Sequence, residues 1–292
     1  MSTMSSTSRP LMGPALVILL SSVGVQAQAA GWTLLPGGTV FDLSSQNIEV
    51  NGQPHGQTVF GELQDLSDAG TWLHTTASVH TEATAAGLLA LGREGTVLID
   101  ASGGASAALL LSATQTLMLD GGEAASLSSL SWTQDVATQV RLQIIGSEGE
   151  APGQRVRVTF SGLADLLHGG GQALDLSGGS QLDLAFTVNG QMLSSLGVNG
   201  NGSFSQALDT SFNAVVGDVI EITLAAHQAL SQTGQTAWPA GQPMSLDRSA
   251  FLQGSLSVAA VPEADLAWLV LGGGLVLLPA LRARRQGRHA QA

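Results

Sequence analysis

The sequence predicts an all-β fold, an antiparallel β-sandwich of jelly-roll type over residues 31–260, with one short apolar helix before it and another after it. Three observations support this fold class. Apolar residues recur at every second position in many short runs, the runs are separated by Gly, Asn, Asp and Ser, and no long stretch of the body keeps a helical period. Many short strands with frequent turns are typical of sandwiches and jelly rolls. One continuous domain fits this length, and a boundary in the loop-like stretch 146–153 is the alternative.

The first 29 residues have the layout of a secretory signal peptide. Arg9 supplies a positive charge, residues 11–25 are apolar, and Ala27 and Ala29 then stand at the Ala-x-Ala spacing that signal peptidase cuts. We therefore expect the Sec translocon to export the chain and signal peptidase to remove residues 1–29. An uncleaved anchor helix is the alternative.

The strands of the body are predicted from their alternation. In residues 181–188, Leu182, Leu184 and Phe186 point to one face and polar residues to the other, which is typical of antiparallel strands with one dry face. Asn189-Gly190 then predicts a two-residue hairpin turn, with residues 191–193 as the return strand. Further strands are expected at residues 39–43, 57–63, 71–83, 95–100, 107–111, 116–120, 127–133, 139–145, 155–160, 203–208, 218–225 and 251–258, and short helices at 123–128 and 163–168.

The charge of the body argues against a nucleic-acid partner. Five of the ten Lys and Arg residues and two of the 22 Asp and Glu residues lie in the terminal segments, so the body holds 5 arginines and 20 acids, a formal charge near −15. Such a surface repels phosphates, and the electrostatic attraction on which non-specific DNA and RNA binding depends is missing. The chain has no cysteine, which removes disulfides, thiolate zinc sites and cysteine nucleophiles.

One polar row in the body resembles a metal-ligand set. His74, Thr76, Ser78, His80 and Glu82 share one face of an extended strand by their period of two. His74 and His80 are six residues apart, roughly 20 Å along a strand, which is too far for one ion. His80 and Glu82 could supply two ligands, but we interpret the row as the solvated outer face of the strand, and no cofactor is expected.

Two other groups of residues are candidates for binding. Five aspartates are expected in or beside loops, where a structural Ca²⁺ is an alternative, although no Asp-x-Asp-x-Asp run packs oxygen ligands closely: Asp165, Asp175, Asp183, Asp209 and Asp218. Three tryptophans could stack on sugar rings, Trp238 above all because residues 235–241 resemble a loop, but core packing is the more usual role of tryptophan: Trp72, Trp132 and Trp238.

The sequence carries no recognisable catalytic motif. No Gly-x-Ser-x-Gly elbow, phosphate-binding loop or dinucleotide fingerprint occurs. A pair of carboxylates for glycoside hydrolysis needs a defined separation across a cleft, which residue order does not reveal. We therefore predict no enzymatic activity and no catalytic residues.

The last part of the chain has three consecutive parts. Val261, Pro262, Glu263 and Ala264 form a short polar stretch, residues 266–281 are an apolar run of 16 positions without charge, and a basic cluster follows. A run of this length is shorter than the ~20 residues that usually cross a bilayer, so it spans only with its flanks or in a thinned membrane. The basic cluster resists translocation and acts as a stop-transfer signal: Arg282, Arg284, Arg285 and Arg288.

This layout resembles the PEP-CTERM sorting signal of Gram-negative bacteria, a tail also classed as an ice-binding-protein C-terminal domain, a label that implies nothing about ice. The resemblance covers residues 261–288 and departs at Ala264, where the family usually has a second proline. It implies recognition by an exosortase, a membrane cysteine peptidase-transferase, and an association with exopolysaccharide and biofilm.

Together these features predict an exported, non-enzymatic protein of the cell surface or extracellular matrix. The C-terminal helix would hold it transiently in the inner membrane, the exosortase would cut near Pro262, and extracellular polysaccharide would be its partner. Two alternatives remain at this point: a secreted carbohydrate-active enzyme with the same tail, and a single-pass membrane protein whose tail is never cut.

Overall fold

The computed structural model describes residues 30–65, 70–84, 87–102, 104–123, 125–146, 151–170 and 177–261. These residues are all-β, and the prediction of an all-β, antiparallel fold is confirmed. The strands are β1 (Gly31–Val50), β2 (Gln53–Asp65), β3 (Thr71–Thr84), β4 (Gly87–Asp100), β5 (Ser106–Leu119), β6 (Ala125–Ile145), β7 (Arg155–Gly170), β8 (Ser180–Val188), β9 (Gln191–Gly200), β10 (Phe204–Val215), β11 (Val219–Trp238) and β12 (Met244–Ala260).

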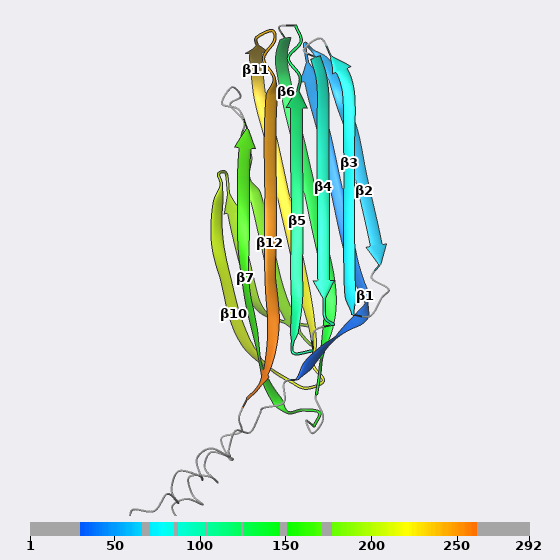
Figure 1. Ribbon diagram of the computed structural model, residues 1–292, viewed down its shortest axis with the longest axis vertical. Helices are drawn as coiled ribbons and strands as arrows, with labels where there is room; N and C mark the ends of the chain where they lie inside the picture. The colour runs from blue at the N-terminus through cyan, green and yellow to red at the C-terminus, as the bar shows by residue number, and fades with distance from the viewer. Residues whose placement is uncertain are drawn as a thin grey trace, which may run out of the picture.

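The strands form two six-stranded sheets that face each other as the two layers of an elongated sandwich (Figure 1). Sheet A has the order β2-β1-β6-β11-β8-β9, and sheet B has the order β10-β7-β12-β5-β4-β3. The last eight strands pair as nested couples, β5 with β12, β6 with β11, β7 with β10 and β8 with β9. This nesting is the connectivity of a jelly roll. Strands β1 to β4 widen both sheets on one side, and each sheet contains strands from both sides of residues 146–153.

Both ends of the body lie at the same end of the long axis (Figure 1). The amide of Trp32 donates to the carbonyl of Gly104, and the amide of Val258 donates to the neighbouring carbonyl of Ala105. The amide of Val261 still donates to the carbonyl of Arg155, so β12 stays attached to the sheet up to the last described residue. This end is called the terminal end below.

The strands are longer than predicted, and both predicted helices are wrong. Residues 163–168 belong to β7, which pairs with β10 on one side and β12 on the other, because Ala164 and Leu166 continue the inward alternation. Residues 125–128 begin β6 and pair with β11. The predicted runs 107–111 and 116–120 merge into β5, and 127–133 and 139–145 merge into β6, because the inward alternation continues through polar residues between the runs.

The predicted hairpin is confirmed, with Asn189 at φ 49° and Gly190 at φ 83°, the left-handed pair that a tight two-residue turn needs. Its return strand β9 runs on to Gly200, beyond the expected residues 191–193. Pairing β9 with β8 completes one edge of sheet A, where the pocket described below lies.

Two separate apolar clusters fill the space between the sheets. The large cluster lies toward the terminal end and contains Phe160, Phe186 and Ile222, all fully buried. The small cluster lies toward the other end and contains Trp132 and Ile48. The clusters are separated by inward-facing polar side chains, described below, so the sandwich has an apolar, a polar and again an apolar section along its length.

Several predicted segments lie outside the described residues: the signal peptide with Ala27 and Ala29, the sorting residues beyond Val261, the apolar run 266–281 and the basic cluster. Within the described ranges, no helix has the length and apolar character needed to cross a membrane. Export and sorting therefore stay predictions.

Candidate functional site

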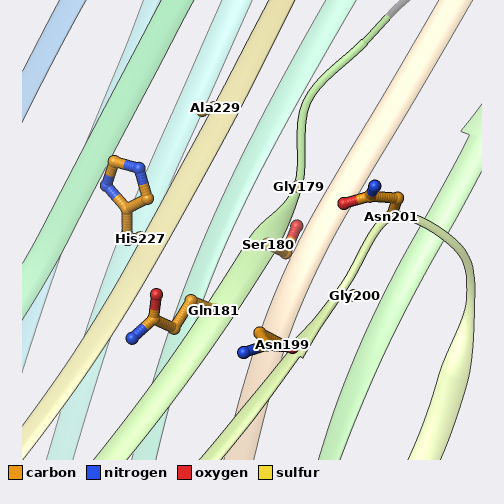
Figure 2. Close-up of a pocket in the computed structure, with 8 residues that line it drawn as sticks. All are labelled: Gly179, Ser180, Gln181, Asn199, Gly200, Asn201, His227 and Ala229. Carbon is orange, nitrogen blue, oxygen red and sulfur yellow. The ribbon is translucent and has the colours of Figure 1, made fainter.

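A polar pocket of about 390 Å³ opens on the outer face of sheet A, where β11, β8 and β9 lie side by side (Figure 2). Register brings three outward side chains into one row, because His227 pairs with Gln181 and Gln181 pairs with Asn199. Asn201 closes the far side, just beyond the end of β9. The lining offers amide, hydroxyl and imidazole groups and contains no Phe, Tyr or Trp: Gly179, Ser180, Gln181, Asn199, Gly200, Asn201, His227 and Ala229.

Carboxylates orient two of these side chains. His227 Nδ1 lies 2.5 Å from Asp135 Oδ1, and Gln181 donates from Nε2 to Asp183 Oδ2 at 2.6 Å. Gly179 forms part of the pocket wall, where a Cβ would lie 2.7 Å from Asn201 Oδ1 and displace that side chain. The result is a shallow, open surface of fixed donors and acceptors, which suits a hydroxyl-rich ligand better than an apolar one.

The inner wall of the pocket reaches into the sandwich through Ser180. Its hydroxyl lies 3.0 Å from His168 Nε2, a bond that joins β8 of sheet A to β7 of sheet B. Burial lowers the pKa of His168 below its ordinary value, and the nearby Arg248 guanidinium lowers it further, while a bond to the backbone of Asn201 opposes both. His168 is therefore neutral at pH 7.

Behind the pocket, inward polar side chains form two facing rows, which together we call the polar layer. In sheet B, cross-strand register aligns five residues from β3 to β7: Ser78, Arg93, Gln115, Arg248 and His168. In sheet A, register aligns four residues from β1 to β8: Ser44, Gln134, Gln228 and Ser180. The layer separates the large apolar cluster from the small one.

A buried ion pair occupies the β3–β4 end of the polar layer. Arg93 donates from NH1 to Asp42 Oδ1 at 2.8 Å, with both side chains 1% exposed, and from Nε to the Ser78 hydroxyl at 2.8 Å. The Thr76 hydroxyl donates to the other oxygen of Asp42. Gly95 leaves room for this contact, because a Cβ there would lie 2.9 Å from Asp42 Oδ2. Asp42 is thus held from two sides by sheet B.

Two more bonds cross between the sheets in the polar layer. Gln134 donates from Nε2 to the carbonyl of Glu94 at 3.1 Å, and Arg248 donates from NH1 to the carbonyl of Ala229 at 2.7 Å. Burial lowers the pKa of Arg248 from its usual value, but a guanidinium stays protonated in proteins. Ala229 also lines the outer pocket, so Arg248 lies directly beneath it.

The predicted solvated face of β3 is wrong at His74 and Thr76, whereas His80 at the end of the row is exposed. His74 and Thr76 are buried and point at sheet A, whereas Leu73 and Val79 on the opposite face are 63% and 73% exposed. The period of two was right and the side was inverted, because the polar row faces Asp42 and Arg93 in the polar layer. At the outer end of β3, Glu82 contacts His80 at 3.5 Å and His55 at 2.9 Å, yet no group of three or more metal-binding side chains was found among the described residues.

The other predicted site residues lie apart from one another. Asp165, Asp183 and Asp209 lie within strands β7, β8 and β10, so their predicted loop position is wrong, and Asp183 lies on the other sheet. Asp218 lies in the β10–β11 turn and accepts bonds from the Asn189 side chain and the Val215 amide. Asp175 lies outside the described residues.

Trp72 and Trp132 lie away from the pocket. Trp72 packs in the large cluster and stacks on His74, and Trp132 packs in the small cluster and donates from Nε1 to the Ser44 hydroxyl at 3.3 Å. Core packing is thereby confirmed for both. Trp238 is the last residue of β11 rather than part of a loop.

Two carboxylates lie beside the pocket, on strands β6 and β8. Asp135 and Asp183 are two strands and two residues apart on the outer face of sheet A. With a strand spacing of about 4.8 Å and a rise of about 3.4 Å per residue, their Cα atoms are roughly 12 Å apart. A glycosidase pair is defined by a distance of about 5 to 9.5 Å between the carboxyl groups themselves, across a cleft, whereas these two acids lie on an open sheet face.

Residue order alone did not reveal the pocket residues Gln181, Asn199 and His227, because exposed polar residues are common on any strand. The polar layer did leave a signal. In β5, Gln115 interrupts the inward series Leu109, Leu111, Ala113 and Leu117, and an amide in such a series predicts a buried polar contact.

Comparison with known proteins identifies no family for this chain. No family model matches it, and no curated protein matches it in sequence. Among solved structures, an α-xylosidase of glycoside hydrolase family 31 from Xanthomonas citri aligns with 63% of this chain at 6% identity and a TM-score of 0.17, and the aligned part is 33% of that protein. The infectious bursal disease virus Gx strain (8% identity, 82% of this chain, 68% of that chain, TM-score 0.16) and the VP2 subviral particle of that virus (8%, 87%, 75%, TM-score 0.13) also align. Likenesses this weak carry no functional argument.

Proposed function

We propose that this protein is an exported, non-enzymatic module of the cell surface or extracellular matrix that an exosortase releases from a transient membrane anchor. One observation carries the proposal most directly. Strand β12 runs to Ala260, and the amide of Val261 still bonds to the carbonyl of Arg155. The sorting motif Val261-Pro262-Glu263 therefore begins where the sheet releases the chain, with no intervening domain.

The position of the two ends supports the same proposal. The first and last strands of the body both meet residues 104–105 at the terminal end (Figure 1). A C-terminal anchor would then fix the sandwich by this end and leave its long axis pointing away from the membrane. The polar pocket and both outer faces would stay open to the matrix.

The chemistry of the pocket supports a polysaccharide partner. Gln181 and Asn199 present amide groups, and His227 presents a ring nitrogen, in one row on a flat sheet face. Hydroxyl-rich polymers are bound through such convergent polar groups.

Processing is tested by mass spectrometry of the protein made in a host that contains an exosortase. We expect a mature chain that starts after Ala29 and lacks residues 282–292. A Pro262→Ala/Glu263→Ala variant is the control, and we expect it to keep the basic tail and to stay in the membrane fraction. An intact tail in the wild-type mature pool would overturn the processing proposal and leave a single-pass membrane protein.

Polysaccharide binding is tested separately by co-sedimentation with the exopolysaccharide of the producing strain. We expect Gln181→Ala/Asn199→Ala to reduce the bound fraction several-fold. Gln253→Ala, which changes an amide on the outer face of sheet B, is the matched control and should bind as the wild type does. Equal binding by both variants would remove the pocket from the proposal.

A further inference from the structure

The centre of the polar layer contains six fully buried polar atoms without a hydrogen-bond partner among the described residues. They belong to four side chains. Gln115 and Arg248 are register partners in sheet B, and Gln134 and Gln228 are register partners in sheet A. Buried polar atoms nearly always have a partner, and each orphan is costly. The six atoms are Nε2 and Oε1 of Gln115, Nε2 and Oε1 of Gln228, Oε1 of Gln134 and Nε of Arg248.

Among the described residues, the charges of the polar layer are also unbalanced. These residues place the guanidiniums of Arg93 and Arg248 in the layer but a single carboxylate, Asp42, which is bonded to Arg93. The ion pairs of the described part of the chain do not include Arg248, whose NH1 bonds to the neutral carbonyl of Ala229. A buried guanidinium cannot lose its proton to relieve this imbalance. One positive charge is thus enclosed in an otherwise acidic protein.

We propose that the polar layer binds a small monovalent anion of the halide class between Arg248 Nε and the side-chain amides of Gln115 and Gln228. The anion supplies the missing negative charge and accepts from all three N–H donors at once. The proposal is restricted to a small anion, because these three side chains are at most 5% exposed and the site is closed to solvent. Ordered water molecules then donate hydrogen bonds to the remaining side-chain amide oxygens. Water alone would satisfy the donors but would leave the charge unbalanced.

The polar layer lies directly beneath the outer pocket. In sheet A the polar row ends at Ser180, whose register partner on β9 is Gly200. Both residues line the pocket, together with Ala229, the backbone partner of Arg248. The halide site therefore lies one layer beneath the surface site but does not depend on what that surface binds.

Crystals of the full-length protein grown with sodium bromide test occupancy directly. We expect an anomalous peak within about 3.5 Å of Arg248 Nε, absent when the crystals are transferred to sodium gluconate. Density explained by water alone, with no anomalous signal at the bromine edge, would overturn the proposal. An Asp175→Asn variant tests whether the Asp175 carboxylate, rather than an anion, balances the charge of Arg248. Bromide bound in this variant but not in the wild type would also overturn the proposal.

Thermal unfolding of the full-length protein gives a second test. With chloride replacing gluconate at constant ionic strength, we expect the wild-type Tm to rise by roughly 3 °C at saturating anion. Arg248→Met should show no such rise, and Gln115→Leu should weaken it. Arg141→Met, on the exposed outer face of sheet A, is the matched control and should keep the full wild-type shift. Equal shifts in the wild type and Arg248→Met would sink the proposal.

Discussion

The large apolar cluster and the polar layer are built from the same strands but hold the two sheets together by different physics. In β7, Phe160 belongs to the large cluster and His168 to the polar layer, and both point inward. Phe160 is held by close packing, which is non-directional, whereas His168 and its neighbours are held by bonds of defined geometry. Apolar packing tolerates a register slip of the facing sheet better than a row of paired donors and acceptors does.

The large cluster and the polar layer therefore contribute differently to the folded state. Burial of apolar surface provides most of the folding free energy, so the large cluster sets stability. The polar layer contributes little net free energy, because desolvation offsets its bonds, but it penalises any arrangement in which Arg93 does not meet Asp42. Our hypothesis is that the layer fixes how sheet A lies against sheet B.

The largest effect is expected in the large cluster. Phe160 is fully buried, lies 5.6 Å from the ring of Phe186, and is covered by Gly162 and Gly254, where an added Cβ would lie 2.6 and 2.5 Å from the ring. Phe160→Ala should lower the free energy of unfolding by about 4 kcal/mol, through lost burial and a cavity. Urea unfolding measures the loss, and Phe160→Leu should lose clearly less. A loss below about 1.5 kcal/mol would show that β7 and β12, which carry Gly162 and Gly254, move in to fill the cavity.

A somewhat smaller loss is expected in the polar layer. Arg93→Met leaves the buried Asp42 carboxylate without its ionic partner and should cost about 3 kcal/mol. The double variant Asp42→Leu/Arg93→Met should recover most of that loss, because no uncompensated charge remains. If the double variant is as unstable as the single one in urea unfolding, the layer contributes stability in its own right and our comparison fails.

The sequence predicted the apolar section well and the polar section poorly, for a physical reason. Where Leu182, Leu184 and Phe186 alternate with polar residues, the apolar side must face the core, and both strand and face are confirmed. In β3 the alternation places His74 and Thr76 against Leu73 and Val79, and polarity alone chose the wrong side. The buried side was decided by Asp42 and Arg93, which are distant in sequence.

Inward-facing polar residues also explain why the predicted strands were too short. Gln115 in β5 and Gln134 in β6 stand at inward positions where an apolar residue was expected, so each strand was divided in two. The row that joins Gln115 to Arg248 depends on the register of β5 with β12, which no local pattern contains. The pocket row from His227 to Asn199 depends in the same way on three strands from separate parts of the chain.

The pH dependence of stability distinguishes the two regions without altering packing. Burial lowers the pKa of His168 below its ordinary value of 6.5, so below that pH the unfolded chain binds a proton more readily than the folded one. The contribution of His168 is therefore complete above pH 6.5 and is lost as the pH falls toward the folded pKa. The fall in Tm between pH 7 and pH 5 should be smaller in His168→Gln than in the wild type. Parallel Tm profiles would contradict the assigned burial of this ring.

The smallest effect is expected on the outer face of sheet A, where a histidine–carboxylate contact is open to solvent. His227 and Asp135 are 2.5 Å apart but 47% and 39% exposed, so water and salt screen their attraction. Asp135→Asn should change the free energy of unfolding by less than about 1 kcal/mol, with the change shrinking further in added salt. Urea unfolding at low and high salt measures this, next to Arg93→Met as the buried counterpart. A loss as large as that of Arg93→Met would mean that this face is desolvated, and only a partner seated over the pocket could do that.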